Sequence, residues 1–264
     1  MIWPRLSTPS FPASWRHADV AYLRSALFNT IMVLSVLIYA SLSLLTFPLP
    51  PLARYRFISQ WARFHIWLAQ PLCGLHYRVE GREHLPAGPA IIMSKHQSAW
   101  ETLAFQVIFP PHTWVLKREL MSVPFFGWAL ALLRPIAIER GTGRRAVEQV
   151  ITQGRERLAA GLWVLVFPEG TRMPPRARRK YKVGGAMLAS ATGYPVVPVA
   201  HNAGTYWPRR GFLKYAGEIR VVIGPVIESK GRSAEEINRL AEEWIEPVME
   251  ELEKPQQVGR GSHK

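Results

Sequence analysis

The chain has 264 residues, enough for one large domain with an appendage, and its 48% hydrophobic against 20% charged residues predict that most of it folds around a core. Its single cysteine, Cys73, excludes an intramolecular disulfide and argues against a zinc site built from cysteines. The formal net charge is +14, and because residues 233–254 carry −6 and residues 255–264 carry +2, residues 1–232 carry about +18. Such a charge beside a long apolar segment predicts a polyanionic partner, such as anionic lipid headgroups, nucleic acid or an acidic carrier protein, in preference to solubility alone.

The N-terminal part of the chain predicts an association with a membrane. Residues 1–18 are rich in Pro and Ser and are predicted to be irregular. Residues 25–47 carry no charged side chain and are long enough to cross a hydrocarbon core of about 30 Å. The stretch differs from a signal peptide, because it is too long and begins too far into the chain. A buried core helix is the alternative interpretation, and the membrane interpretation is favoured.

Two arrangements of this membrane segment are open. Residues 25–47 either span the membrane once, or the prolines of 48–51 turn the chain back into a second helix over 55–72. The second helix mixes Arg with Trp and Phe, a combination that suits the headgroup boundary. Basic residues flank both ends, so the charge bias does not choose between the arrangements. The prolines directly after the apolar run favour the hairpin, and we assign residues 19–74 to membrane-associated helical segments.

From residue 75 onward the pattern alternates between short apolar strands and helices. Strands that are apolar nearly throughout argue for a sheet covered by helices on both faces. We therefore predict an α/β fold over residues 75–254, with a mixed, mostly parallel sheet flanked by helices, and a flexible tail over residues 255–264. The predicted strands are Tyr77–Glu80, Ala90–Met93, Thr113–Leu116, Pro135–Ile138, Leu162–Phe167, Val196–Ala200 and Ile219–Ile223. The predicted helices are 99–108, 122–132, 144–160, 184–192 and 233–252.

A histidine and an acid follow the second predicted strand. His96 comes just after Ala90–Met93, and Glu101 lies five residues further on. Because the ends of strands carry the sites of α/β proteins, His96 is a candidate general base and Glu101 the acid that steers it. Five residues on one helix turn through about 500°, so the pair can meet only if His96 lies in the loop and Glu101 in the first helical turn. Ser98 is the predicted N-cap of that helix, with Glu101 completing a capping box, so the local sequence leaves two roles open for Glu101, the steering acid and the cap.

Other strand ends carry charged and polar residues as well. The strand over 162–167 leads into Phe167-Pro168-Glu169-Gly170-Thr171-Arg172. An arginine can hold a phosphate in a bidentate fork, and a glycine lets the backbone come close to a ligand. Two further strand ends carry Lys117-Arg118-Glu119-Leu120 and His201-Asn202. The residues around Arg172 therefore indicate a phosphate site near the histidine.

Four motifs, in their order and spacing, resemble the glycerolipid acyltransferase family, in particular its 1-acyl-glycerol-3-phosphate acyltransferases. The resemblance covers about residues 75–225. It implies the transfer of a fatty acyl group from a thioester carrier to a glycerol hydroxyl, with no metal and no other cofactor. The motifs are His96-x4-Glu101, Lys117-x-Glu119-Leu120 with Phe126-Gly127-Trp128, Phe167-Pro168-Glu169-Gly170-Thr171-Arg172, and Val197-Pro198-Val199.

The same resemblance implies roles for individual residues. His96 would take the proton of the acceptor hydroxyl as that hydroxyl attacks the thioester, and Glu101 would hold the imidazole in the required tautomer. Arg172 with Lys117 would hold the phosphate of the acceptor, and we expect backbone N–H groups of the turn at 96–99 to stabilise the developing oxyanion. The implied substrate-binding residues are Lys117, Glu119, Glu169, Gly170, Thr171 and Arg172.

Two positions depart from the family's pattern. The family's acid is usually Asp where this chain has Glu101, and the residue before the histidine is often Asn where this chain has Lys95. Because the carboxylate is retained, we expect activity. The two changes leave open which acceptor lipid is used.

The resemblance also implies partners and a location. We expect lysophosphatidic acid as acceptor, acyl-CoA or acyl carrier protein as donor of the acyl group, and contact with anionic membrane lipids. The catalytic domain would face the cytoplasm at the inner membrane. The basic run over 176–182 is either merely solvated or attracts anionic lipid, the phosphates of coenzyme A or acyl carrier protein. His201 has no acid at a similar spacing and is predicted to be structural or to support the site from behind.

Two alternative functions remain. The nearest is the same chemistry on another lyso-lipid, such as a lyso-aminolipid or a lysophospholipid. The other is a basic protein without catalytic activity that binds membranes or nucleic acid. We disfavour it and expect no nucleic-acid partner, because nucleic-acid binding would give the apolar residues 25–47 no role.

Overall fold

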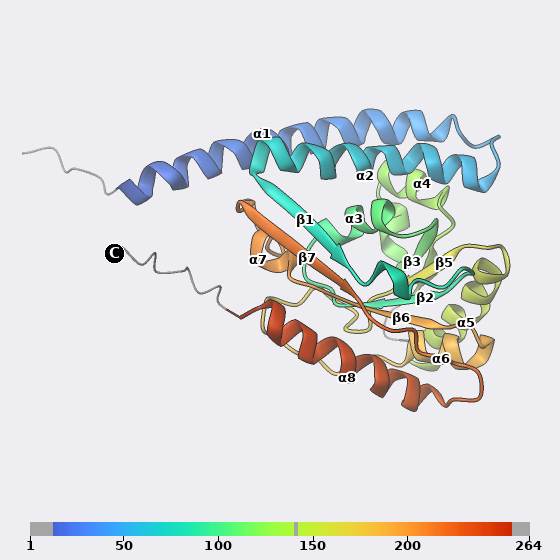
Figure 1. The fold of residues 1–264 in the computed structure, drawn as a ribbon. Helices are drawn as coiled ribbons and strands as arrows, with labels where there is room; N and C mark the ends of the chain where they lie inside the picture. The colour runs from blue at the N-terminus through green and yellow to red at the C-terminus, as the bar shows by residue number, and fades with distance from the viewer. Residues whose placement is uncertain (1–12, 140–141, 255–264) are drawn as a thin grey trace, which may run out of the picture.

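The computed structural model describes residues 13–139 and 142–254, and residues 1–12, 140–141 and 255–264 lie outside that description. Two long N-terminal helices are followed by strands and helices that alternate along the chain (Figure 1). The helices are α1 (Ala13–Leu44), α2 (Pro51–Cys73), α3 (Trp100–Ile108), α4 (Phe126–Ala131), α5 (Arg144–Ala159), α6 (Gly184–Thr192), α7 (Ala203–Tyr206) and α8 (Ala234–Leu252), with 3-10 turns η1 (Arg82–His84) and η2 (Arg118–Ser122). The strands are β1 (Leu75–Glu80), β2 (Ile91–Ser94), β3 (His112–Lys117), β4 (Ile136–Ile138), β5 (Trp163–Val166), β6 (Val196–His201) and β7 (Gly217–Ile223).

All seven predicted strands are present, and two of the predictions made for other segments need correction. Residues 13–18, predicted to be irregular, belong to α1. The helix predicted over 122–132 is instead the turn η2 followed by the short helix α4. Pro124 separates the two, and Phe125 has a φ of 59°, which no continuous right-handed helix contains. The rest of the predicted irregular N-terminus and the predicted flexible tail lie outside the described residues.

The seven strands form one sheet in the order β1-β7-β6-β2-β5-β3-β4. Every neighbouring pair is parallel except β6 and β7, so the predicted mixed, mostly parallel sheet is confirmed. Because β2, β3, β4, β5 and β6 run in one direction, their carboxyl ends lie at the same edge of the sheet. The segments that follow β2, β3 and β5 and carry the first three sequence motifs therefore meet at that edge, whereas Val197-Pro198-Val199 lies within β6.

Helices cover both faces of this sheet (Figure 1). Side chains in β2 and β5 alternate between the two faces, since a strand has a period of two residues. Ile92 and Leu165 pack in the core shared with α2 and α3, whereas Ile91 and Val164 pack in the core shared with α5, α6 and α8. Both faces are apolar, which is why these strands read as continuous hydrophobic runs.

Helices α1 and α2 form the hairpin that the prolines favoured. The chain turns back over residues 45–50, and Pro51 occupies the first position of α2, where its missing N–H costs nothing. The Tyr39 hydroxyl donates to the Phe57 carbonyl at 2.7 Å, and the Trp61 indole donates to Ser35 Oγ at 3.0 Å. Helix α2 also packs against α3, so the hairpin is docked along the domain.

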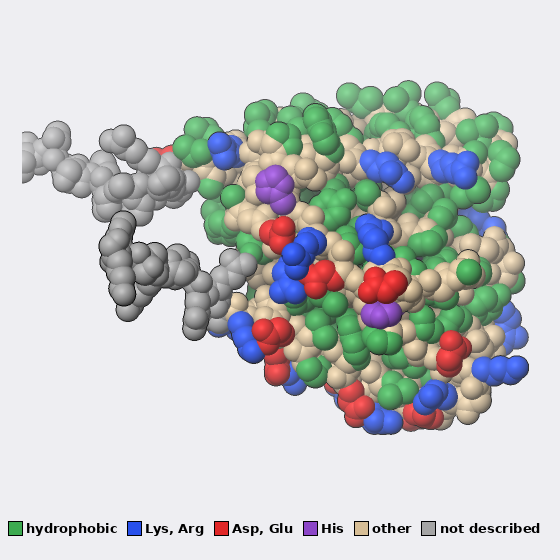
Figure 2. Space-filling view, in the orientation of Figure 1, with side chains coloured by type: hydrophobic (Ala, Val, Ile, Leu, Met, Phe, Trp, Pro, Cys, Tyr) green, Lys and Arg blue, Asp and Glu red, His purple; other side chains and the backbone are tan. Residues whose placement is uncertain are grey.

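The outward side of the hairpin is apolar. Among the described helices, one segment, Asp19–Leu44 of α1, is long and apolar enough to cross a membrane, and only 17% of its most apolar window is buried. Leu34, Leu37 and Ile38 are each more than half exposed. Figure 2 shows hydrophobic side chains along the hairpin, at the top of the view, and charged side chains gathered over the sheet and α8. Exposure of this kind is unusual for a surface that meets only water.

Candidate active site

His96 and Glu101 meet at the carboxyl end of β2. The His96 Nδ1 and Glu101 Oε1 atoms are 2.8 Å apart, with the Glu101 side chain fully buried and that of His96 14% exposed. Since Nδ1 is engaged by the carboxylate, Nε2 is the ring nitrogen left for a substrate. Burial acts to raise the pKa of Glu101, but the interactions with His201, His96 and the Ser98 N–H outweigh it and hold the pKa below its usual value. The carboxylate is therefore charged at neutral pH.

The loop-to-helix geometry that allows this contact differs in one detail from the prediction. Helix α3 begins at Trp100 with Ala99 as its N-cap residue, one residue later than predicted. Ser98 Oγ still accepts a hydrogen bond, from the Trp100 N–H at 3.0 Å. Glu101 reaches back to the Ser98 N–H at 2.9 Å, which is the glutamate half of a capping box. The geometry of Glu101 is therefore compatible with both of the roles that the local sequence left open.

The backbone of His96 is held from both sides by the turn after β5. Its N–H donates to Glu169 Oε2 at 3.0 Å, and its carbonyl accepts from the Met173 N–H at 2.7 Å. The imidazole also stacks on the Phe167 ring, with centroids 3.8 Å apart and planes 14° from parallel. Two motifs that are distant in the sequence thus form one rigid unit. Phe167 was quoted only as part of a motif, and the sequence offered no signal of its stacking role.

The expected oxyanion donors need correction. The N–H groups of Gln97 and Ser98 both donate to Glu101 Oε1 at 2.9 Å, and that of His96 donates to Glu169. These three groups are already used to hold carboxylates. In this structure these three groups are therefore not free to bind an oxyanion, and the expectation stays a prediction only for the N–H of Ala99.

Glu169 lies behind the site, where it forms an ion pair. Its Oε1 atom is 2.8 Å from the ammonium of Lys95, and both side chains are almost completely buried. The Lys95 ammonium also lies 2.9 Å from Glu246 Oε1 of α8. Burial acts to lower the pKa of Lys95, but the two carboxylates outweigh it and raise the pKa. The sequence had marked Lys95 only as a departure from the family's pattern.

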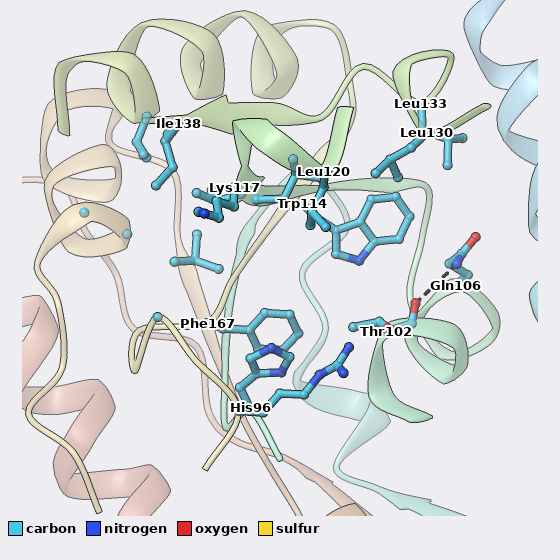
Figure 3. Close-up of a pocket in the computed structure, with 18 of the residues that line it drawn as sticks. His96, Thr102, Gln106, Trp114, Lys117, Leu120, Leu130, Leu133, Ile138 and Phe167 are labelled. Atoms are coloured by element: carbon cyan, nitrogen blue, oxygen red, sulfur yellow. Dashed lines mark hydrogen bonds between the residues drawn. The ribbon is translucent and has the colours of Figure 1, made fainter. Parts of the chain in front are cut away.

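A cavity of about 670 Å³ opens at His96. Its lining is mainly apolar and comes from the hairpin, α3, β3, α4 and α5. In Figure 3, His96 and Phe167 stack at one end, with Leu130, Leu133 and Trp114 on one side and Ile138 on the other. Cavities of this size and lining suit small or medium-sized apolar ligands. The site can therefore place an apolar chain next to a histidine base.

Cationic side chains gather around the same cavity. Lys117, Arg172 and Lys182 line it, and so does Gly170. Gly170 has a φ of 68°, a backbone conformation that favours glycine, and a Cβ atom there would come within 2.9 Å of the far end of the flexible Lys182 side chain. The sequence had assigned Lys182 only to the basic run.

The remaining predicted substrate residues do not line the cavity in the described part of the chain. Glu119 forms an exposed ion pair with Lys117 at 2.9 Å. Thr171 lies in the turn between Gly170 and Arg172. Roles for Glu119, Glu169 and Thr171 in substrate binding stay predictions. In the described residues no group of three His, Cys, Asp or Glu side chains could hold a metal ion.

His201 is buried at the end of β6. Its Nε2 atom lies 2.9 Å from the Lys95 carbonyl, and its Nδ1 atom accepts from the Ala203 N–H at 3.3 Å. Both ring nitrogens are therefore used by the backbone. His201 supports the loop that carries His96, as predicted.

Comparisons with known proteins agree with this arrangement. The family model described as Acyltransferase matches residues 76–202. A protein of Pseudomonas aeruginosa named 1-acyl-sn-glycerol-3-phosphate acyltransferase is 48% identical over 93% of this chain and 97% of its own length. Its namesake from Saccharomyces cerevisiae is 29% identical over 74% of this chain and 66% of its own length. The crystal structure of the 1-acyl-sn-glycerophosphate (LPA) acyltransferase from Thermotoga maritima has the same fold, with a TM-score of 0.73 and 24% identity over 88% of this chain and 96% of that one.

The fold is that of an acyltransferase. The chain belongs to the acyltransferase family, within its group of 1-acyl-sn-glycerol-3-phosphate acyltransferases.

Proposed function

We propose that the protein transfers a fatty acyl group from acyl-CoA or acyl-acyl carrier protein to the sn-2 hydroxyl of lysophosphatidic acid, giving phosphatidic acid. The single observation that carries the proposal is the His96–Glu101 pair at the end of an apolar cavity with cationic side chains around it. The pair supplies a base, the cavity suits an acyl chain, and the cations suit a phosphate. The acyl thioester is a co-substrate, and the proposed reaction uses no metal or other cofactor.

The proposed reaction is a direct transfer. His96 Nε2 takes the proton of the sn-2 hydroxyl while the oxygen attacks the thioester carbonyl. The tetrahedral intermediate then collapses and the C–S bond breaks. The departing thiolate takes from the imidazolium the proton that came from the hydroxyl. Glu101 holds the Nδ1–H tautomer at 2.8 Å and stabilises the imidazolium between the two steps. No acyl-enzyme is needed, and the lone cysteine, Cys73, is buried at the end of α2.

The cavity suggests how the substrates are arranged. An acyl chain lies in its apolar part beneath the hairpin, which Leu130, Leu133 and Trp114 line. The phosphate of the acceptor lies against Arg172 and Lys117, and Lys182 adds a third cation. In this pose the glycerol hydroxyl lies between the phosphate site and His96.

The basic run after Arg172 suits the acyl donor. Arg176 and Arg178 are held by acids of α8, since the Arg176 N–H donates to Glu253 and the Arg178 guanidinium pairs with Glu250. Arg179 and Lys180 are exposed. We assign these two to the phosphates of coenzyme A or to the acidic surface of acyl carrier protein.

We place the protein at the inner membrane, with the catalytic domain in the cytoplasm and the hairpin seated in one leaflet. The exposed apolar side of α1 supports contact with lipid. Helix α4 lies beside α1, and η2 packs against α4. Leu120, Phe125 and Trp128 in this region are each more than 40% exposed and extend the apolar surface. Basic residues of α2, such as Arg54 and Arg56, would lie at the level of anionic headgroups.

The experiment that tests the function is an acyl-transfer assay with purified full-length protein in detergent–lipid micelles. Acyl-CoA and acyl-acyl carrier protein are each paired with lysophosphatidic acid, lyso-aminolipids and lysophospholipids. The proposal predicts the fastest release of thiol with lysophosphatidic acid, and phosphatidic acid as product. A faster reaction with another lyso-lipid would reassign the acceptor, and salt-sensitive DNA binding without thioester consumption would overturn the enzymatic function.

A further inference from the structure

A buried lysine directly before the proposed base ties together four parts of the chain. The Lys95 ammonium lies 2.8 Å from Glu169 Oε1, 2.9 Å from Glu246 Oε1 and 3.2 Å from the Ala177 carbonyl. The ammonium donates hydrogen bonds to Glu246 and to the Ala177 carbonyl, and it forms an ion pair with Glu169. Lys95 is 1% exposed, so its side chain is almost completely shielded from solvent. It joins the end of β2 to the turn after β5, the following loop and α8.

Further contacts complete the network on the side of α8. The Tyr181 hydroxyl donates to Glu246 Oε1 at 2.8 Å, and Arg178 Nε lies 3.5 Å from Glu246 Oε2. The two carboxylates thus share one buried lysine, and Arg178 adds a positive charge from the surface. Buried charges are tolerated only with partners of this kind, so loss of one member is expected to disturb the others.

The network reaches the proposed base through Glu169. One oxygen of Glu169 faces Lys95, and the other accepts the His96 N–H at 3.0 Å. The same turn carries Gly170 and Arg172, which line the cavity. The orientation of the Glu169 carboxylate therefore sets where the His96 backbone lies relative to the proposed phosphate site.

We propose that Lys95 and Glu246 are positioning residues for acyl transfer, which hold Glu169 so that the His96 loop and the Arg172 turn keep their relative placement. The inference rests on the proposed function. Neither side chain lines the cavity, so neither touches the substrates. Helix α8, on the opposite face of the sheet from the hairpin, thereby sets the geometry of the reaction.

This relation predicts an unusual pattern for two substitutions. Lys95→Met leaves the Glu169 carboxylate buried without its ammonium. Glu169→Gln replaces the carboxylate with an amide, whose oxygen accepts hydrogen bonds but whose NH2 group only donates them. The side chain can therefore accept from the Lys95 ammonium or from the His96 N–H, but not from both. In the double variant the amide oxygen can accept the His96 N–H, and no unpaired ammonium remains. We therefore expect the double variant to be more active than either single variant.

The test measures kcat, KM and the melting temperature for the full-length protein in detergent–lipid micelles, with lysophosphatidic acid and an acyl thioester. Lys95→Met and Glu169→Gln should each lower kcat per folded molecule about 10²-fold, the loss expected from misplaced reacting groups, while KM changes little. The double variant should recover part of that loss. Glu246→Gln keeps an acceptor for Lys95 and Tyr181 and should lower kcat less. Glu243→Gln is the matched control. Glu243 forms an exposed ion pair with Arg239 on the same helix, so its replacement should leave kcat unchanged.

Two results would overturn the inference. One is a melting temperature that falls while kcat per folded molecule stays at the wild-type value, which would make the network purely structural. The other is a double variant whose loss is the product of the two single losses. If Lys95→Met does not fold, an unchanged kcat in Glu246→Gln overturns the inference in its place. Failure of the wild type to acylate any lyso-lipid would instead refute the proposed function, so the two failures can be distinguished.

Discussion

Glu101 Oε1 lies 2.8 Å from His96 Nδ1, and the same oxygen accepts the backbone N–H groups of Gln97 and Ser98 at 2.9 Å. One carboxylate oxygen therefore starts helix α3 and orients the imidazole. The longer glutamate, where the family usually has aspartate, reaches His96 from the first turn of the helix. The cap holds the steering acid in place, so the two roles support each other.

Glu101→Gln separates these roles, because an amide oxygen can accept the same three hydrogen bonds while the negative charge is lost. We expect kcat to fall about 10²-fold or more, since the imidazolium loses its counter-charge, with a small change in melting temperature. Ser98→Ala is the matched control. It removes the hydrogen bond that Ser98 Oγ accepts from the Trp100 N–H and should cost about 1 kcal/mol of stability with little change in kcat. Full activity in Glu101→Gln would leave Glu101 with the capping role alone.

Arg172→Ala tests the phosphate site. The guanidinium lines the cavity near His96, so its loss should raise KM for lysophosphatidic acid about tenfold or more, in line with a lost charged hydrogen bond of about 1.5–3 kcal/mol. KM for a neutral monoacylglycerol should change much less. Arg118→Ala is the control, because Arg118 pairs with Glu139 at the surface and does not line the cavity. Equal increases in KM for the two acceptors would argue against a phosphate role.

Substitutions that add negative charge to the outer face of the hairpin test whether this face binds the membrane. Leu34→Glu with Ile38→Glu places two carboxylates where both leucine and isoleucine are more than half exposed. We expect partition into vesicles containing anionic lipid to fall about tenfold or more, because each acid forfeits apolar burial and meets negative headgroups. Thr152→Glu with Ala159→Glu on α5 adds the same charge to an exposed helix on the other face of the sheet and should leave binding nearly unchanged. Equal losses in the two proteins would show that net charge, not the hairpin, governs binding.

The lowered pKa of His112 predicts how the stability of the protein depends on pH. Burial lowers the pKa of this histidine to about 4, with the Pro110 carbonyl, which its Nδ1–H reaches at 3.0 Å, opposing the shift. The unfolded chain binds the proton near pH 6.5, so the native state binds fewer protons between these values. Its contribution to stability is complete above pH 6.5 and is lost as the pH falls toward 4. At pH 5 the loss amounts to about 2 kcal/mol.

Thermal unfolding of His112→Gln at pH 5 and pH 7 measures this contribution. The variant should be less stable than the wild type at pH 7 and should lose less stability between the two pH values. His76→Gln is the control, because His76 is exposed and should leave the pH dependence unchanged. An identical pH dependence in His112→Gln and the wild type would contradict the assignment.

Much of the fold could be predicted because it depends on local patterns. Apolar runs with short polar breaks marked all seven strands, and the turn at 48–51 favoured the hairpin. The helix-start signal at Ser98 indicated that His96 and Glu101 could meet, and the resemblance to the family implied that they do. Where the sequence misled, as at Phe125, an unusual backbone conformation after Pro124 interrupted a helix whose residues suit one.

The contacts of Lys95 could not be predicted, because its partners lie 74 and 151 residues away in the sequence. No local pattern predicts that a lysine beside the histidine is buried between two glutamates. Glu169 was assigned to the substrate pocket through the family resemblance, and that role stays a prediction. Its motif is correctly placed at the end of β5, but the side chain points behind the site.

The most direct test of His96 as the base is His96→Ala in the full-length protein, assayed with lysophosphatidic acid and an acyl thioester. Loss of a positioned base should lower kcat about 10²–10⁴-fold. Because the side chain is not part of the hairpin, partition into vesicles should stay at the wild-type level. Turnover close to that of the wild type in a folded, membrane-bound His96→Ala protein would contradict the assignment of His96 as the general base.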